Sequence, residues 1–172
     1  MKTLSVLLLS LLLLWGCKEE KADRYFSSSS EIDQAKALIE DYEKGDWQAM
    51  KGHYADTAKI YHNSTTAITP SDFVSSFEQG TAIYQSYGFQ DKDQYYEMII
   101  DDKDERWVNF WGNWEATFKD KDTSVVVPVH VTLEFKDGKI VEEHAFYDSA
   151  PIMMVMNQIQ SMKAMEQEEM NP

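Results

Sequence analysis

The chain has 172 residues, which is the length of one domain with short extensions. Its 16 lysines and arginines against 30 aspartates and glutamates give a formal net charge of −14, so it should repel nucleic acid and anionic lipid surfaces. Because 43% of the residues are hydrophobic and 13% aromatic, the composition supports a packed core. The only cysteine is Cys17, which excludes an intrachain disulfide and a cysteine-based zinc site.

Residues 1–16 have the layout of a secretory signal peptide. Lys2 supplies a positive start, and the leucine-rich run that follows is shorter than the roughly 20 apolar residues that span a bilayer. The run ends in Leu14-Trp15-Gly16-Cys17, which resembles a bacterial lipobox except for the large Trp15. The resemblance implies lipidation of Cys17 by acyl chains such as palmitate. An ordinary signal peptide with an incidental cysteine is the alternative.

Residues 17–30 predict a flexible tether, because they hold four consecutive serines and few apolar side chains. Two or more acyl chains on Cys17 would hold the protein stably on a membrane. The tripeptide Lys18-Glu19-Glu20 resembles the signal that sends some Gram-negative lipoproteins to the outer face of the outer membrane. A plain charged tether would have the same sequence, so the periplasmic leaflet stays an alternative to surface display.

Two helices are expected at the start of the domain. Ser30, with an acid three residues later, marks the N-terminus of the first helix, and Gly45 marks its end. Asp46 then caps the second helix. The second helix is expected to carry Trp47, Met50 and Tyr54 inward.

A short strand and a third helix follow. Residues 58–62 predict the strand and residues 63–69 a loop. Thr69, Pro70 and an acid at position 72 are start signals for the third helix, which we expect to continue to Gly88.

Two strands come next, over residues 95–100 and 106–118. In the second of these, period-two alternation separates an apolar face from a mixed face. The apolar face, which we expect to look inward, carries Val108, Phe110, Gly112, Trp114, Ala116 and Phe118. The mixed face carries Trp107, Asn109, Trp111, Asn113, Glu115 and Thr117.

A hairpin over residues 125–148 gives the clearest pattern in the chain. The odd-numbered residues from Val125 to Phe135 form an apolar face, and Asp137-Gly138 form the centre of the turn. A two-residue turn would add Ile140, Glu142, His144, Phe146 and Asp148 to that face. A G1 bulge at Gly138 would instead add Val141, Glu143, Ala145 and Tyr147. We favour the bulge, because the other register buries two acids and a histidine among valines.

The order of these elements resembles the nuclear transport factor 2-like superfamily, which includes SnoaL-type polyketide cyclases, ketosteroid isomerases and limonene epoxide hydrolase. The residues that carry the resemblance are Gly45-Asp46-Trp47, Tyr54-Ala55-Asp56-Thr57-Ala58 and the hairpin from Phe135 to Asp148. The resemblance covers residues 31–148. It implies an α+β fold in which N-terminal helices pack on a strongly curved antiparallel sheet and enclose an apolar pocket in a cone-shaped domain, residues 31–150.

The functional residues of these relatives match this sequence only in part. The general base of ketosteroid isomerases falls at His62, but their oxyanion-donating tyrosine falls at Leu38 and the neutral acid beside it near Val131. A second pocket tyrosine falls near Phe77. The aspartate that cyclases and epoxide hydrolases keep on the last strand falls at Ala145. Steroid isomerisation is therefore not expected.

His62 is the best candidate for a reactive group, because its ordinary pKa lets it act as acid or base at neutral pH. Glu143, two residues before Ala145, could orient it, and Tyr42 or Tyr61 could supply a hydroxyl. The alternative is that His62 only makes a local hydrogen bond at a strand end. The residues expected to line a binding pocket are Tyr42, Phe77, Phe110, Trp114, Val131, Leu133 and Tyr147.

The remaining histidines show no metal-binding spacing, and neither a metal nor another cofactor is expected. His130 and His144 should lie with Trp107 and Trp111 on the outer face of the sheet. That face suits a homodimer, or else it packs against the C-terminal segment.

Residues 151–172 predict a methionine-rich helix over the sheet or the pocket mouth, followed by a tail that frays after about Ala164. Methionine-based copper binding is not favoured, because no second ligand type is interleaved.

Three hypotheses about function follow. The leading one is a membrane-anchored domain that binds a small apolar molecule. The second is an enzyme of the isomerase, dehydratase or cyclase kind with His62 as base. The third is an interaction module of the cell envelope. The residues do not decide between the first and the second.

Overall fold

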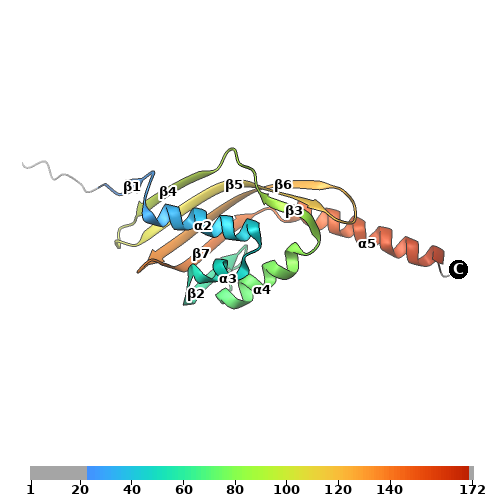
Figure 1. Cartoon of the computed structure of the whole chain (residues 1–172), viewed down its shortest axis with the longest axis horizontal. Helices are drawn as coiled ribbons and strands as arrows, with labels where there is room; N and C mark the ends of the chain where they lie inside the picture. Colours follow the sequence, from blue (N-terminus) through green and yellow to red (C-terminus); the bar gives the residue numbers. More distant parts are fainter. Residues whose placement is uncertain (1–22, 171–172) are drawn as a thin grey trace, which may run out of the picture.

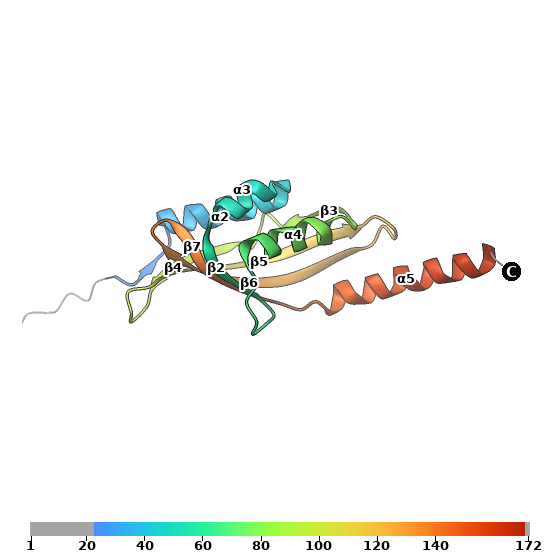
Figure 2. The same ribbon diagram turned by 90° about the horizontal axis from the view of Figure 1, so that it is seen from below.

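The computed structural model describes residues 23–170 and shows one curved sheet with helices on its concave side (Figure 1). Helices α2, α3 and α4 cover that side, and helix α5 projects from one end of the sheet (Figure 2). The elements are β1 (Tyr25–Phe26), α2 (Ser30–Lys44), α3 (Trp47–Gly52), β2 (Tyr54–His62), α4 (Pro70–Thr81), β3 (Tyr84–Phe89), β4 (Tyr95–Ile100), β5 (Arg106–Phe118), β6 (Ser124–Lys136), β7 (Lys139–Tyr147) and α5 (Ala150–Met170). Among the helices of residues 23–170, none combines the length and apolar character needed to cross a bilayer.

The helix boundaries follow from local capping. The N-cap of α2 is Ser29, whose side chain accepts a hydrogen bond from the backbone N–H of Ile32, so the prediction of Ser30 as the cap is wrong by one residue. Gly45 ends α2 in the left-handed conformation, as predicted. Asp46 caps α3, which confirms that prediction too.

Two boundaries differ from the predictions. The second helix ends at Gly52, and Tyr54 is already the first residue of β2. Helix α4 starts at Pro70 as expected but ends at Thr81, and residues 84–89 form strand β3 where helix was predicted up to Gly88. Strand pairing with β5 decides the conformation of this segment.

The sheet has the order β1-β4-β5-β6-β7-β2, and β3 pairs with β5 off this path. Among the strands of residues 23–170, all pairings are antiparallel except that of β2 with β7, which is parallel. Strands β4 and β5 have the predicted bounds. The predicted inner face of β5 is confirmed, because its even-numbered residues from Val108 to Phe118 alternate buried with more exposed neighbours.

The turn between β6 and β7 is the two-residue type. Asp137 (φ 52°) and Gly138 (φ 73°) are both left-handed, and Lys136 pairs with Lys139 across them. Positive φ at both central residues is the signature of a type I′ turn, which matches the twist of the flanking strands. The prediction of a G1 bulge within the turn is therefore wrong.

A bulge nevertheless follows one residue later and sets the register of β7. Phe135 pairs with Ile140 and Glu134 with Glu142, which leaves Val141 as the extra residue. Beyond the bulge the inner face carries Glu143, Ala145 and Tyr147, as predicted, but Ile140 takes the inner position expected for Val141. The turn therefore differs from the prediction, but the bulge after it places the residues from Glu143 onward on the predicted faces. Glu142 and His144 point outward.

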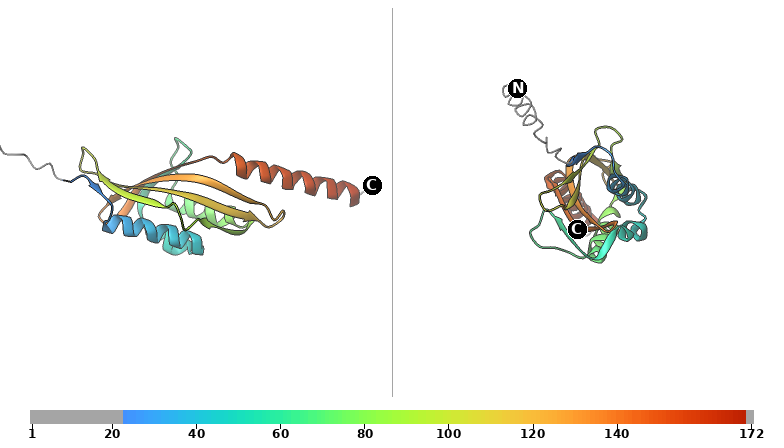
Figure 3. Two further views of the ribbon diagram at one scale, coloured as in Figure 1. Left: turned by 90° about the horizontal axis from the view of Figure 1, so that it is seen from above. Right: turned by 90° about the vertical axis from the view of Figure 1, so that its left-hand side faces the viewer.

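The two ends of the described chain also differ from the predictions. Tyr25–Phe26, inside the predicted tether, is a short strand that pairs with β4. Helix α5 continues to Met170 instead of fraying near Ala164. Its Val155 is buried against the domain, and Lys163 forms an ion pair with Asp120 at 2.6 Å. The second half of α5 extends past the sheet (Figure 3). Cys17 and the predicted signal peptide lie outside the described residues.

Candidate functional site

A cavity of about 330 Å³ lies between the concave face of the sheet and helices α2 and α4. Its walls are mostly apolar and come from the inner faces of β5, β6 and β7 together with these helices. The residues predicted to bind a ligand all line it: Tyr42, Phe77, Phe110, Trp114, Val131, Leu133 and Tyr147. His62 and Glu143 line it as well, so both candidate reactive groups face one common space.

Glu143 is the centre of a buried polar cluster at this cavity. Its Oε1 lies 2.8 Å from Nε2 of His62, and its Oε2 accepts a hydrogen bond from the hydroxyl of Tyr54. Only 3% of Glu143 is exposed, so both carboxylate oxygens need such partners to offset desolvation. Because an ionised carboxylate can only accept, Nε2–H of His62 donates this hydrogen bond, and no residue of the range 23–170 hydrogen-bonds Nδ1 of His62. His62 therefore has its second nitrogen available beside the cavity.

The imidazole of His62 is held in place by three aromatic rings. The ring centroids of Phe73, Phe77 and Tyr147 lie 4.7, 5.6 and 6.0 Å from that of His62. Helix α4 supplies the two phenylalanines and β7 supplies the tyrosine. These contacts restrict the ring to the orientation in which Nε2 meets Glu143.

The parallel pairing of β2 with β7 brings the cluster together. Ile60 pairs with Glu143 and His62 with Ala145, so the inner positions of the two strands are neighbours. Glu143 occupies an inner position only because of the bulge at Val141. One residue fewer in β7 would turn the carboxylate outward and the side chain of Glu142 or His144 inward.

Burial raises the pKa of Tyr54, and the adjacent carboxylate of Glu143 raises it further. Burial also raises the pKa of Tyr147, with a smaller contribution from Glu143. Both phenols therefore remain protonated at neutral pH, and Tyr54 donates its proton in a hydrogen bond to Glu143. The site holds a carboxyl group, an imidazole and protonated phenols beside an apolar space, which is a set suited to proton transfer.

The comparisons with known proteins agree with this architecture. A family model described as "SnoaL-like domain" matches residues 35–143, which is more than half of the chain. The chain belongs to the SnoaL-like domain family. No curated protein sequence matches it.

Solved structures resemble the SnoaL-like domain in fold. IdmH of Streptomyces antibioticus, a proposed polyketide cyclase, is 14% identical with a TM-score of 0.60, over 75% of this chain and 99% of that one. A proposed SnoaL-like polyketide cyclase of Shewanella denitrificans is 16% identical with a TM-score of 0.57, over 78% and 99%. PrhC of Penicillium brasilianum is 17% identical with a TM-score of 0.60, over 78% and 93%. At these identities the likeness establishes the cone-shaped α+β fold.

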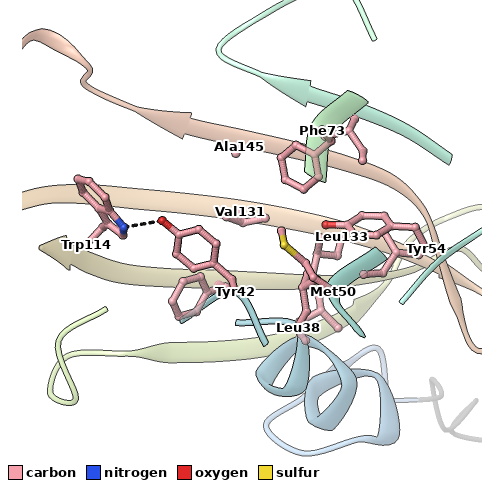
Figure 4. Packing of buried hydrophobic residues seen from close by; sticks show 14 of the residues in the cluster. Leu38, Tyr42, Met50, Tyr54, Phe73, Trp114, Val131, Leu133 and Ala145 are labelled. Atoms are coloured by element: carbon pink, nitrogen blue, oxygen red, sulfur yellow. Dashed lines mark hydrogen bonds between the residues drawn. The ribbon is translucent and has the colours of Figure 1, made fainter. Parts of the chain in front are cut away.

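A second polar pair lies on the cavity wall of the SnoaL-like domain. Nε1 of Trp114 donates a hydrogen bond of 2.8 Å to the hydroxyl oxygen of Tyr42 (Figure 4). Burial raises the pKa of Tyr42, so its hydroxyl also stays protonated. Tyr42 lies one helical turn after Leu38, the position where the resemblance would place a tyrosine donor and where the chain has a buried leucine.

Two tyrosines have other partners in the structure than the sequence predicts. Tyr61 points away from the cavity and stacks on His144 at 4.6 Å, so its predicted hydroxyl is not available to the site. Tyr54 was expected to pack inward from a helix and was missed as a partner of Glu143. The signal was present, since Tyr54 and His62 are eight residues apart and share a strand face once β2 is extended to residue 54.

The outer face of the sheet carries stacked aromatic and histidine side chains. Trp111 stacks on His130 with their ring centroids 4.7 Å apart, and Tyr61 stacks on His144. Nε2 of His144 also lies 2.8 Å from Oε1 of Glu142. Within residues 23–170, no cluster of three or more histidines, cysteines or acids could hold a metal ion. That this face pairs with a second copy stays a prediction.

Proposed function

We propose that the domain binds a small, mainly apolar molecule in the cavity between the sheet and helices α2 and α4. The observation that supports this proposal is a cavity of about 330 Å³ with apolar walls and few polar groups, a size and composition typical of ligand sites. Moving apolar surface out of water into such a space contributes about 25 cal/mol per Å².

Thermal unfolding of the purified protein tests this proposal. Tetralin, a compact hydrocarbon of two fused rings, should raise the melting temperature with increasing concentration, because a ligand that binds only the folded state stabilises it. Ala145→Leu, which extends a cavity-lining side chain, should remove this effect. Val126→Leu on the outer face is the matched control and should retain it. An equal response of all three proteins would contradict binding in the cavity.

The second candidate function is acid–base catalysis on a molecule held in the same cavity. The 2.8 Å contact of His62 with Glu143, together with the Tyr54 hydroxyl on the other carboxylate oxygen, favours it. An imidazole that is paired with a carboxylate can remove a proton from a carbon next to a carbonyl, the step that isomerases, dehydratases and cyclases share. Nδ1 of His62 would take the proton, while Glu143 stabilises the imidazolium that results.

Proton exchange tests this candidate. The acidic protons of 2-tetralone should exchange with deuterium faster with the wild-type protein than in buffer, and His62→Gln should abolish the acceleration. General base catalysis typically contributes about 10²- to 10⁴-fold. His144→Gln is the matched control on the outer face. If wild type and His62→Gln gave the same exchange rate, His62 would not be the base.

We also propose that Cys17 is lipidated and anchors the domain to the outer membrane, with the domain at the cell surface and the periplasmic leaflet as the alternative. The sequence Leu14-Trp15-Gly16-Cys17 supports this. Cys17→Ser should release the protein from the membrane fraction, and protease added to intact cells distinguishes the two sides. An unchanged distribution of Cys17→Ser would rule out the anchor.

A further inference from the structure

The hydroxyl of Tyr42 accepts a hydrogen bond from the protein, but its own proton has no acceptor among residues 23–170. Tyr42 is 6% exposed, yet it lines the cavity. Its oxygen already accepts a hydrogen bond from the indole N–H of Trp114, which can only donate. Within residues 23–170, no group accepts a hydrogen bond from the Tyr42 hydroxyl. The proton of this hydroxyl is therefore free for an acceptor that enters the cavity.

The ring of Tyr42 cannot easily turn to find another partner. Four aromatic rings surround it, with centroid distances of 5.2 Å to Phe77, 5.3 Å to Tyr87, 6.3 Å to Trp47 and 6.4 Å to Phe89. Three elements, α3, α4 and β3, supply these rings. Because burial raises the pKa of Tyr42, the group remains a donor and does not become a phenolate acceptor. A buried donor without an acceptor is unfavourable, so a ligand that supplies one gains affinity.

The Tyr42 hydroxyl and the His62 cluster face the same cavity, and the side chain of Phe77 lies beside both. The ring centroid of Phe77 lies 5.2 Å from that of Tyr42 and 5.6 Å from that of His62. The wall between them is apolar. A ligand in the cavity thus meets a hydrogen-bond donor at one point, an imidazole at another and apolar surface elsewhere.

We infer that the cavity selects molecules with an apolar skeleton and one hydrogen-bond-accepting oxygen, such as a ketone, and that Tyr42, oriented by Trp114, is the residue that recognises this oxygen. The inference rests on the proposed binding function and adds the chemical class of the ligand. It does not depend on catalysis by His62, because Tyr42 would select the same molecules in a protein that only binds them.

Two probes of nearly equal shape test the inference. Tetralin and 1-tetralone differ by one carbonyl group, and their dissociation constants are measured by calorimetry on the purified full-length protein. Tyr42→Phe should weaken binding of 1-tetralone by about two- to tenfold, the value of one neutral hydrogen bond, and leave tetralin within about twofold. Tyr87→Phe is the matched control. It removes a neighbouring hydroxyl that contacts the Tyr42 carbonyl and does not line the cavity.

The outcomes separate this inference from the proposed function. If tetralin binds and Tyr42→Phe affects both probes equally or neither, Tyr42 recognition is wrong while apolar binding stands. If neither probe binds the wild type, both fail. A measurement without a mutation guards against misfolding of the variant: the carbonyl stretch of bound 1-tetralone should fall below its frequency in cyclohexane. An unshifted band, or a shift that persists in Tyr42→Phe, would overturn the inference.

Discussion

The two faces of the paired strands β2 and β7 each carry a contact between a histidine and a glutamate, one buried and one exposed to water. On the inner face Glu143 contacts His62 at 2.8 Å, with side chains 4% and 16% exposed. On the outer face the preceding residue, Glu142, contacts His144 at the same distance, with both side chains about 30% exposed. Distance alone therefore does not separate a candidate site from a surface ion pair. Burial does, because a desolvated carboxylate depends on its partners far more than a hydrated one.

Removal of the inner carboxylate should have the largest effect. Glu143→Ala should lower the free energy of unfolding by about 3–5 kcal/mol, because it leaves Tyr54 and His62 buried without their acceptor. Glu142→Ala, the matched change on the outer face, should cost at most about 1 kcal/mol. Urea unfolding monitored by fluorescence measures both. Equal losses would show that the two faces do not differ in the way that burial implies.

The next largest loss of stability should follow removal of the Tyr54 hydroxyl, which donates a hydrogen bond to Oε2 of Glu143. Tyr54→Phe should cost about 1.5–3 kcal/mol, the range for a hydrogen bond to a charged group. Tyr61→Phe removes a hydroxyl from the outer side of the same strand and should stay within about 0.5 kcal/mol of wild type. The same urea measurements apply. A Tyr54→Phe protein as stable as Tyr61→Phe would argue against a tightly bonded inner cluster.

Filling the cavity should weaken ligand binding and also lower the free energy of unfolding. Ala145→Leu should weaken tetralin binding by at least about tenfold, since the added atoms occupy the space of the ligand, while overpacking costs about 1–3 kcal/mol. Val126→Leu on the outer face should change neither quantity appreciably. Calorimetric titration gives the affinities, and unchanged affinity in Ala145→Leu would place any tetralin site elsewhere.

The smallest expected effect is a pH dependence on the outer face. Burial against its neighbours lowers the pKa of His130 below its ordinary value of 6.5. Protonation then favours the unfolded chain, so the contribution of His130 to stability is complete above pH 6.5 and is lost as the pH falls below it. His130→Gln should reduce the fall in melting temperature between pH 7.5 and 5.5.

Trp111→Phe is the control for this last prediction, because it changes the ring stacked on His130 without removing a titrating group. It should retain the pH dependence of the wild type. The assignment to His130 is wrong if His130→Gln and Trp111→Phe lose melting temperature to the same extent over that range.

Much of the fold was predictable because its signals are local. Alternation of apolar residues identified β5 and β6 and their inner faces, and capping residues located the start of α4. The cavity residues on β5 and β6 followed from the same alternation once the resemblance supplied the cone, and Tyr42 and Phe77 followed from helical spacing. Strand β3 was missed, because its sequence continues a helical pattern and only pairing with β5 makes it a strand.

The sequence by itself thus determined the inner faces of β5 and β6, and it indicated His62 and Glu143 as candidates for one site. Only the tertiary structure decided that they touch, that Tyr54 completes the cluster and that Trp114 orients Tyr42. The physical reason is that side-chain periodicity is a property of each strand alone. The parallel pairing of β2 with β7 depends on contacts between segments about 80 residues apart, as the separation of 81 between His62 and Glu143 illustrates. The bulge at Val141 depends on how β6 and β7 pair beyond their turn.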